Sequence, residues 1–321
     1  MNAVERAADV LGPKGRRRVP LGPFTTYRVG GPAALLLVVE SEADLELARG
    51  AVTASGVPVL VVGKGSNLLV SDAGFPGLAV VLAGLDGVTV DAESLRARGE
   101  AGALLPVLAR RTAAAGLTGL EWAVGVPGSV GGAVRMNAGG HGADVARTLV
   151  RYRFVDLMGG DDGVFGPERL DFGYRRSTVA AHHVVVWAEF GLAPGDRSSS
   201  EARIADIVRW RREHQPGGQN AGSVFTNPIG DSAGRIIDAV GLKGLRRGSA
   251  HVSLKHANFI QVDEGGSADD VVAVIRDVQD RVLAEAGVGL KPELRLVGFD
   301  AEALPLDPAD PAGPYPTDAS R

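Results

Sequence analysis

Short apolar runs separated by amphipathic stretches predict a chain that alternates between buried strands and helices. Residues 33–39 and 57–62 are continuous apolar runs of strand length, as expected for strands that are buried on both faces. Between these runs, Ser41 and Asp44 have nearly the spacing of a capping box, and Gly56 is a typical stop residue. The pattern therefore predicts strand, helix and strand in succession near the start of the chain.

The clearest helix is predicted over residues 268–286. Ser267 precedes it as a cap, Gly287 follows it as a stop, and five apolar residues recur between them at helical spacing. Weaker signals of the same kind predict helices over 103–115 and 201–214 and a strand over 184–190.

A polar segment over residues 194–200, containing proline, glycine and three serines, is the predicted boundary between two domains. One domain is therefore predicted over 19–196 and a second over 197–300. The ends of the chain are predicted to be a polar tail over 1–18 and a proline-rich disordered tail over 301–321.

Composition narrows the possible functions. Glycine supplies 45 of the 321 residues, about twice its usual share, and favours loops that approach a ligand closely. The formal net charge of −4 argues against a general nucleic-acid binder. The absence of cysteine excludes disulfides and thiol chemistry and fits a cytoplasmic protein. The apolar runs are far shorter than the roughly 20 residues needed to span a bilayer, so no membrane association is expected.

The first candidate site is the segment Gly63-Lys64-Gly65-Ser66-Asn67, directly after the apolar run 57–62. Its free backbone N–H groups are suited to hold a pyrophosphate, because glycines let an anion come close. The segment is not the dinucleotide-binding GxGxxG pattern, and on its own an ordinary turn is the simpler interpretation.

The second candidate site lies within residues 119–142, which are predicted to form a glycine-rich loop region. Its segment 125–142 combines two glycine pairs with Pro127 and Asn137. With few side chains in the way, the main chain is suited to hold a flat or anionic ligand. A purely structural loop of this length would be uncommon.

Polar residues elsewhere are less specific. In Tyr174-Arg175-Arg176, a guanidinium able to hold a carboxylate stands beside a phenol, although a solvated basic pair is the plainer interpretation. Ser223 is not in the Gly-x-Ser-x-Gly elbow of a hydrolase. The pairs His182-His183 and His251/His256 lack an evident carboxylate or third ligand, so no metal site is predicted.

Taken in order, these segments closely resemble the UDP-N-acetylenolpyruvoylglucosamine reductase (UDP-N-acetylmuramate dehydrogenase) family, flavoenzymes of bacterial peptidoglycan precursor synthesis. The chain is most similar to the shorter subclass, since no long insertion follows Tyr174-Arg175. The resemblance covers most of the chain and rests on eight segments: residues 25–32, 65–69, 125–132, 136–139, 173–175, 221–225, 241–244 and 252–260, followed by a last match at 291–298.

The resemblance implies a two-subdomain FAD-binding domain of the vanillyl-alcohol-oxidase type and a C-terminal α+β substrate-binding domain. It also implies non-covalent FAD, NADPH as electron donor, UDP-N-acetylglucosamine enolpyruvate as substrate, and a cytoplasmic monomer with neither nucleic-acid nor membrane partners. The implied residues are Arg175, Ser223 and Glu293 for catalysis; Gly63, Gly65, Ser66, Asn67, Gly125, Pro127, Gly128, Gly131, Gly132, Asn137 and Gly139 for FAD; and Tyr174, Asn227, Lys255 and His256 for substrate, with no metal ligand.

In the implied reaction NADPH reduces the flavin, which then delivers hydride to the enolpyruvyl ether. Arg175 stabilises the developing enolate, Ser223 supplies a proton to carbon, and Glu293 assists. Two departures affect ligand contacts: Gly140-His141 stands where members commonly have Ala-Tyr, and Thr226 stands where a basic residue is frequent.

Two alternatives to the reductase remain. A flavoprotein oxidase of the same fold would keep the glycine segments without needing Arg175, Ser223 and Glu293 together. A non-catalytic protein that binds a nucleotide sugar or a flavin would keep the glycine segments and lack the catalytic acid. The presence of all three polar residues favours the reductase.

Overall fold

The chain passes repeatedly between two structural units instead of forming two consecutive domains. In the computed structural model, which describes residues 1–299, the first unit comprises residues 1–16, 36–64 and 79–213. The second comprises residues 17–35, 65–78 and the described residues from 214 on. This division differs from the expected linear one at 196/197, because two early segments pack with the end of the chain. The expected tail over 301–321 lies outside the described residues.

Residues 1–18 are not a polar tail. Ala3–Leu11 form helix α1, and Arg16–Pro20 form strand β1. The side chain of Asn2 accepts a hydrogen bond from the Glu5 N–H at 2.9 Å and caps the helix. Ala7 and Leu11 are buried, and α1 packs against α2 (Glu42–Ser55). The apolar face is too short to stand out among charged neighbours, which is why the sequence pattern missed it.

Helix α2 confirms the expected capping signals. The Asp44 carboxylate accepts hydrogen bonds from the Glu40 and Ser41 N–H groups, each at 3.0 Å. Gly56 ends the helix in the left-handed conformation, with φ of +69°. Lys14 forms an ion pair with Asp44, so the helix start is tied to the N-terminal segment of the same unit.

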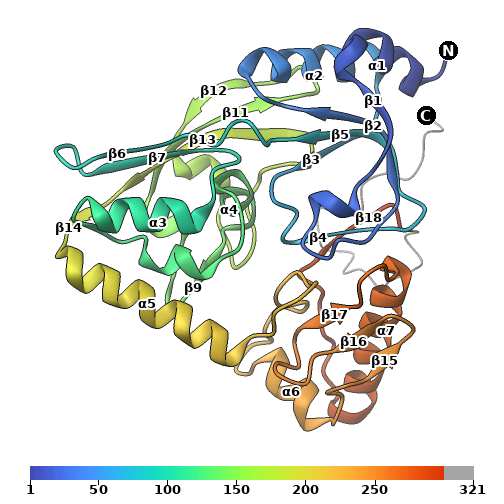
Figure 1. Ribbon diagram of the computed structural model, residues 1–321, viewed down its shortest axis with the longest axis vertical. Coiled ribbons are helices and arrows are strands. Elements are labelled where there is room, and N and C mark those ends of the chain that lie inside the picture. Colours follow the sequence, from blue (N-terminus) through green and yellow to red (C-terminus); the bar gives the residue numbers. More distant parts are fainter. Residues whose placement is uncertain (300–321) are drawn as a thin grey trace. The chain divides into compact units, whose positions relative to one another are not determined.

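A five-stranded antiparallel sheet with the order β12-β11-β13-β7-β6 forms the centre of the first unit. Figure 1 shows α3 (Leu105–Ala114) and α4 (Val130–Met136) on one side of this sheet. The expected helix over 103–115 and strand over 184–190 are therefore confirmed. The strands are β6 (Val88–Asp91), β7 (Arg96–Glu100), β11 (Leu149–Asp156), β12 (Asp162–Phe165) and β13 (His183–Gly191).

The glycine-rich residues 119–142 are not only a loop, since they contain a 3-10 helix (Glu121–Gly125) and α4. A Cβ on Gly131 would lie 3.2 Å from the Val185 carbonyl oxygen of β13, so glycine lets α4 approach the sheet closely. Val130 and Val134 on the same helix are fully buried. Close packing, not local propensity, therefore stabilises this helix.

The expected linker over 194–200 is largely helical, because α5 spans Arg197–His214. The Asp196 carboxylate accepts the Ser199 N–H at 2.7 Å, and buried Ser200 donates to the Glu121 carboxylate at 2.6 Å. The chain changes units at 213/214, at the end of this helix.

The second unit has its own core around α7 (Ala268–Ala286), which confirms the clearest sequence prediction. Ser267 caps α7, Gly287 ends it with φ of +67°, and the expected apolar stripe is buried. The core also includes Tyr27 and Leu69 from the two early segments. The remaining elements of this unit are β4 (Leu68–Val70), α6 (Ala233–Ala239), β15 (Arg246–Arg247), β16 (Ala250–Val252), β17 (Ile260–Val262) and β18 (Arg295–Val297).

Strands β15, β16 and β17 form one small antiparallel sheet beside α7, and β4 pairs with β18 in parallel. A four-stranded sheet has the order β1-β2-β5-β3, and the chain changes units inside both β2 and β5. The bounds still to be given are β2 (Pro32–Val38), β3 (Val59–Val62), β5 (Phe75–Val81), β8 (Leu117–Thr118), β9 (Gly139–Gly140), β10 (Ala143–Asp144) and β14 (Ala193–Pro194).

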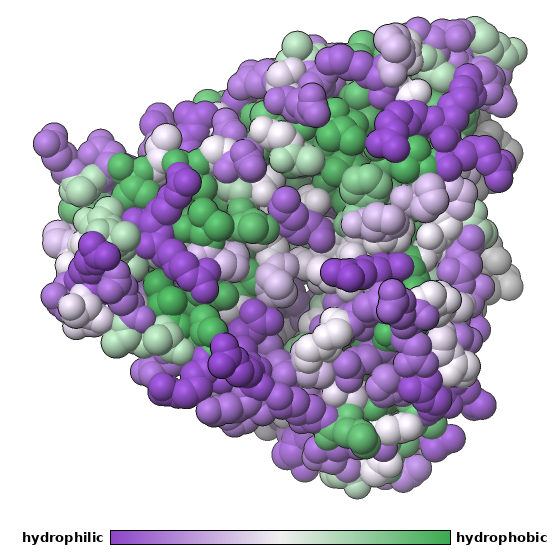
Figure 2. Space-filling model, in the orientation of Figure 1, coloured by the Kyte–Doolittle hydropathy of each residue, from purple (hydrophilic) through white to green (hydrophobic). Residues whose placement is uncertain are grey.

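Hydrophobic residues on the face drawn in Figure 2 are interrupted by hydrophilic ones. Within residues 1–299, no helix has both the length and the apolar character that crossing a membrane requires.

Candidate active site

Within the first unit, the start of the first glycine segment contacts the second segment at Ser129. Gly63 follows β3, and Ser129 immediately precedes α4. A Cβ on Gly63 would lie 2.4 Å from the Ser129 Oγ, so any larger residue there would force this hydroxyl to move. The Ser129 Oγ is buried and has no hydrogen-bond partner among residues 1–299. An unpaired buried hydroxyl costs free energy, so its place between the two segments fits a site that a ligand oxygen completes.

Gly65 is held equally closely in the second unit. Its φ is +58°, and a Cβ there would lie 2.2 Å from the carbonyl oxygen of Phe24. The Thr26 N–H donates to the Gly65 carbonyl at 3.2 Å, while the Thr26 Oγ1 is buried without a partner in the described part of the chain. The first glycine segment is therefore a tightly packed turn with a second unsatisfied hydroxyl beside it.

The other FAD candidates follow one another along a single path in the first unit. Gly125 ends the 3-10 helix, Pro127 and Gly128 lead to α4, and the carbonyl of Gly128 accepts the Leu105 N–H at 3.0 Å. Gly131 and Gly132 lie in the first turn of α4, Asn137 follows its end, and Gly139 lies in β9.

Arg175 lies on a two-residue turn that docks onto this path. Gly173 and Arg176 exchange main-chain hydrogen bonds of 3.0 and 3.2 Å around the turn. The Arg175 Nη2 donates to the Gly139 carbonyl at 2.7 Å, and its guanidinium carbon lies 5.0 Å from the centre of the exposed Tyr174 ring. The predicted catalytic arginine and the second glycine segment are therefore brought together.

Arg175 also has an unusual backbone conformation, with φ of +55°. This position of a turn usually takes glycine or asparagine, and another residue costs about 1–3 kcal/mol there. Strained residues of this kind concentrate at functional sites. The strain is therefore independent support for a functional Arg175.

Ser223 and Glu293, seventy residues apart in sequence, lie on neighbouring backbone segments of the second unit. The Glu293 N–H donates to the carbonyl of Val224, the residue after Ser223, at 2.7 Å. Phe225 and Pro292 pair as the next antiparallel bridge. Two of the three predicted catalytic positions therefore belong to one hydrogen-bonded ladder.

Asn67 connects that ladder to the first glycine segment. Its side-chain Nδ2 donates to the Glu293 carbonyl at 3.1 Å, and its own carbonyl accepts the Arg295 N–H at 3.1 Å. The parallel pairing of β4 with β18 begins at the next residue, with Leu68 opposite Arg295. The candidate cofactor turn and the candidate acid Glu293 are thus joined immediately before the strand pair of β4 and β18.

Asn258 is a residue that sequence reasoning missed. It is buried, its Oδ1 accepts the Phe225 N–H at 2.9 Å, and its Nδ2 donates to the Phe225 carbonyl at 2.8 Å. Its carbonyl also accepts the Val224 N–H at 2.9 Å. Asn258 therefore fixes the segment after Ser223 from the other side. The only sequence signal was a polar residue between Ala257 and Phe259.

The predicted substrate residues of the second unit lie in two loops. Lys255 and His256 lie between β16 and β17, and the Asn227 Oδ1 accepts the Ala233 N–H at 3.1 Å at the start of α6. Burial is the main cause that lowers the pKa of His256. Its Nδ1 accepts the Asn258 N–H at 3.3 Å, which leaves Nε2 as the protonated donor of the neutral ring.

The two departures from the family pattern have local explanations. The His141 ring packs edge-on against Trp210, with 5.2 Å between ring centres. Burial, followed by the charges of Arg211 and Arg203, lowers the pKa of His141. Thr226 donates its N–H to the Lys291 carbonyl at 2.9 Å and so extends the ladder that holds Glu293.

The expectation that His182-His183 lack a nearby carboxylate is wrong, since the Asp156 carboxylate lies 3.6 Å from the Nε2 of His182 and 4.0 Å from that of His183. However, the Nδ1 of His183 accepts the Ala180 N–H at 3.1 Å. The proton of the neutral His183 ring is then on Nε2, the atom that faces Asp156, and a protonated nitrogen is not a metal ligand. The geometry therefore does not favour a metal at this cluster.

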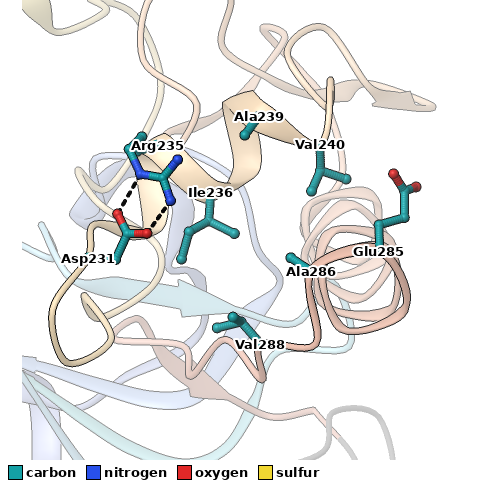
Figure 3. Close-up of a pocket in the computed structure, with 8 residues that line it drawn as sticks. All are labelled: Asp231, Arg235, Ile236, Ala239, Val240, Glu285, Ala286 and Val288. Carbon is teal, nitrogen blue, oxygen red and sulfur yellow. Dashed lines mark hydrogen bonds and ion pairs between the residues drawn. The ribbon is translucent and has the colours of Figure 1, made fainter.

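A cavity of about 470 Å³ lies elsewhere in the second unit, between α6 and the end of α7 (Figure 3). The Arg235 guanidinium and the Asp231 carboxylate form an ion pair at its edge. The lining includes none of the predicted site residues: Asp231, Arg235, Ile236, Ala239, Val240, Glu285, Ala286 and Val288.

Comparisons with known proteins identify two domains in the chain. Residues 33–161 match the FAD binding domain family, and residues 214–297 match the C-terminal domain of UDP-N-acetylenolpyruvoylglucosamine reductase. The second match begins where the chain enters the second unit for the last time. The predicted combination of an FAD-binding domain with a C-terminal α+β domain is confirmed.

The closely packed glycine segments and the FAD-binding domain define a flavin-dependent oxidoreductase. The UDP-N-acetylenolpyruvoylglucosamine reductase of Rubrobacter xylanophilus is 44% identical over 292 residues, which are 90% of this chain and 97% of that protein. The enzyme of the same name from Paramagnetospirillum magneticum is 42% identical over 285 residues, which are 88% of this chain and 92% of that protein. The chain belongs to the UDP-N-acetylenolpyruvoylglucosamine reductase family.

A solved structure supports the same conclusion. The crystal structure of the reductase from Thermus caldophilus covers 88% of this chain, and the match spans 99% of that chain. The TM-score is 0.76 at 38% sequence identity.

Proposed function

We propose that this protein reduces UDP-N-acetylglucosamine enolpyruvate to UDP-N-acetylmuramate, a step of peptidoglycan precursor synthesis, with non-covalent FAD and with NADPH as electron donor. The observation that carries the proposal is the ladder that joins Glu293 to Val224, beside Ser223, and to Asn67 of the first glycine segment. We further propose that the protein acts as a cytoplasmic monomer, which agrees with the absence of cysteine.

FAD supplies hydride transfer when it is bound. The groups proposed to hold it are backbone groups of the two glycine segments, where the Gly63 and Gly65 backbones are closely packed, and the Ser129 and Thr26 hydroxyls, which have no partner among residues 1–299. Backbone N–H groups in such turns suit the pyrophosphate. The proposed substrate residues are Tyr174, Asn227, Lys255 and His256.

The chain's own residues then stabilise the developing charge and deliver a proton. Negative charge develops on the substrate carboxylate as the enolpyruvyl double bond is reduced, and the permanently charged, planar Arg175 guanidinium is suited to stabilise it. Ser223 delivers a proton to the carbon that bears this carboxylate. Glu293 orients that proton or hydrogen-bonds the developing enolate. Because Asn67 and Val224 hold the Glu293 main chain, its side chain starts from a fixed backbone position.

An anaerobic titration of the purified holoenzyme tests the proposal. NADPH should bleach the flavin absorbance, and UDP-N-acetylglucosamine enolpyruvate should then restore it without oxygen. A flavin that is reoxidised by oxygen but not by this substrate would indicate an oxidase. A protein that cannot be reconstituted with FAD would overturn the proposal altogether.

A further inference from the structure

The turn that carries Arg175 is attached to the last turn of α4 and to the segment after it by three side-chain hydrogen bonds. The Ser177 Oγ donates to the Arg135 carbonyl at 2.6 Å, and the Arg175 Nη2 donates to the Gly139 carbonyl at 2.7 Å. Between them, the Asn137 Nδ2 donates to the Gly173 carbonyl at 3.0 Å. Of the three, the Asn137 contact reaches the main chain of the turn itself.

The Asn137 amide has protein partners at both ends. Its Oδ1 accepts the Ala146 N–H at 3.0 Å, and its Nδ2 donates to the Gly173 carbonyl at 3.0 Å and to the Asp144 carboxylate at 3.5 Å. The side chain is buried, with 4% exposed. The residue itself has φ of +40°, which asparagine tolerates better than most residues. Both Nδ2 hydrogens therefore have protein acceptors, so a contact of Nδ2 with FAD would replace one of these hydrogen bonds.

A strained turn needs such an anchor. Arg175 has φ of +55°, and a conformation of this kind persists only where the surrounding structure imposes it. The Gly173 carbonyl both closes the turn, by accepting the Arg176 N–H, and accepts the Asn137 amide. Loss of the amide would release the turn at the point that sets the direction of the Arg175 side chain.

We propose that Asn137 is a positioning residue for Arg175 and does not bind the cofactor through its side chain. This inference rests on the proposed function of Arg175. Asn137→Ala should retain FAD and be reduced by NADPH at a rate close to wild type. Reoxidation by the enolpyruvyl substrate should slow about 10–100-fold, because displacements of about 1 Å at a catalytic group have effects of this size.

Two variants make the test specific. Asn137→Asp keeps the size and the acceptor for Ala146, but it replaces the donation to Gly173 with repulsion from the Gly173 carbonyl and the Asp144 carboxylate. It should therefore show at least the same selective defect, and it tests the inference if Asn137→Ala does not fold. In an Arg175→Ala background, Asn137→Ala should cause no further slowing of reoxidation, since residues that act through one another are not additive. Ser177→Ala is the matched control, because it removes a contact of similar length outside the turn.

Hydrogen exchange gives a readout that does not depend on turnover. The amides of Gly173 and Arg176 should lose protection in Asn137→Ala and Asn137→Asp and keep it in Ser177→Ala. Unchanged protection, unchanged reoxidation, or loss of FAD binding in both Asn137 variants would overturn the inference. A wild-type enzyme that the substrate fails to reoxidise would instead refute the proposed function, while the exchange result would still decide whether Asn137 anchors the turn.

Discussion

Substitution of Gly65 by alanine tests whether the first glycine segment is needed for close backbone approach. Gly65 has φ of +58°, and its missing Cβ would lie 2.2 Å from the Phe24 carbonyl oxygen and 2.7 Å from the Thr25 Cα. Gly287 is the control in the same unit. It has a similar φ of +67° at the end of α7, and an added Cβ there meets nothing within 4 Å among the described residues.

Both variants place an alanine in the left-handed backbone conformation, and only Gly65→Ala also creates a clash. A left-handed alanine costs about 1–2 kcal/mol at either position. Gly65→Ala adds a clash with main-chain atoms that cannot rotate away, and overpacking of this kind typically costs about 1–3 kcal/mol more. The expected losses in free energy of unfolding are therefore about 1–2 kcal/mol for Gly287→Ala and about 2–5 kcal/mol for Gly65→Ala.

Urea denaturation followed by far-UV circular dichroism measures both losses. Tryptophan fluorescence should be recorded in parallel, because Trp122, Trp187 and Trp210 all lie in the first unit and report on it alone. If the circular dichroism transition moves to a lower urea concentration than the fluorescence transition, the lost stability lies in the second unit. Equal losses of stability in the two variants would refute the argument from close approach.

Four further predictions follow from the site and from one helix cap. Ser223→Ala should slow flavin reoxidation by the substrate about 10²–10⁴-fold and spare reduction by NADPH in stopped-flow measurements; equal slowing of both would make the residue structural. Arg175→Lys should not restore the activity lost in Arg175→Ala, because an ammonium lacks the planar fork, and full rescue in steady-state assays would contradict this. Glu293→Gln should retain more activity than Glu293→Ala, and reoxidation of the alanine variant at the wild-type rate would exclude a catalytic role. The hydrogen bond from Lys14 is the main cause that lowers the pKa of Asp44 in the folded protein, so the ionised Asp44 carboxylate stabilises the fold above about pH 4 and this stabilisation is lost as pH falls. Asp44→Asn should therefore flatten the decline in the urea-derived free energy of unfolding between about pH 5 and 3. An unchanged slope would show that Asp44 does not contribute to the acid sensitivity.

Local signals in the sequence predicted those elements whose cause is local. Helix α7 has its cap, apolar stripe and stop residue within one continuous stretch, and each has its expected role in the structure. Helix α4 has residues of capping type at its ends, Ser129 and Asn137, but its two glycines weaken its propensity. Its stability depends on close approach to β13, which the sequence pattern does not show. The start of α5 was missed although Asp196 caps it locally through the Ser199 N–H, because the surrounding polar and serine-rich residues are equally typical of a linker. Only the contact of Ser200 with Glu121 is distant in sequence.

The two glycine segments were predicted from their residue types, whereas the catalytic positions could be predicted only through resemblance to a family. Nothing in the spacing of Ser223 and Glu293 indicates that a main-chain hydrogen bond joins their segments. Likewise, nothing in the sequence indicates that Asn67 and Asn258 each fix the main chain beside a predicted catalytic residue. Non-local pairing of this kind depends on the whole fold, so a pattern read along the chain does not contain it.

The interleaved course of the chain also bears on the order in which the protein is completed during synthesis. Tyr27 and Leu69, both fully buried in the second unit, leave the ribosome long before residues 214–299, with which they pack. Strand β4 is likewise synthesised long before β18, its parallel partner. We therefore expect translation products that stop before Arg295 to expose the edge of β4 and to be recognised by chaperones and proteases, even though they contain the complete FAD-binding match over 33–161.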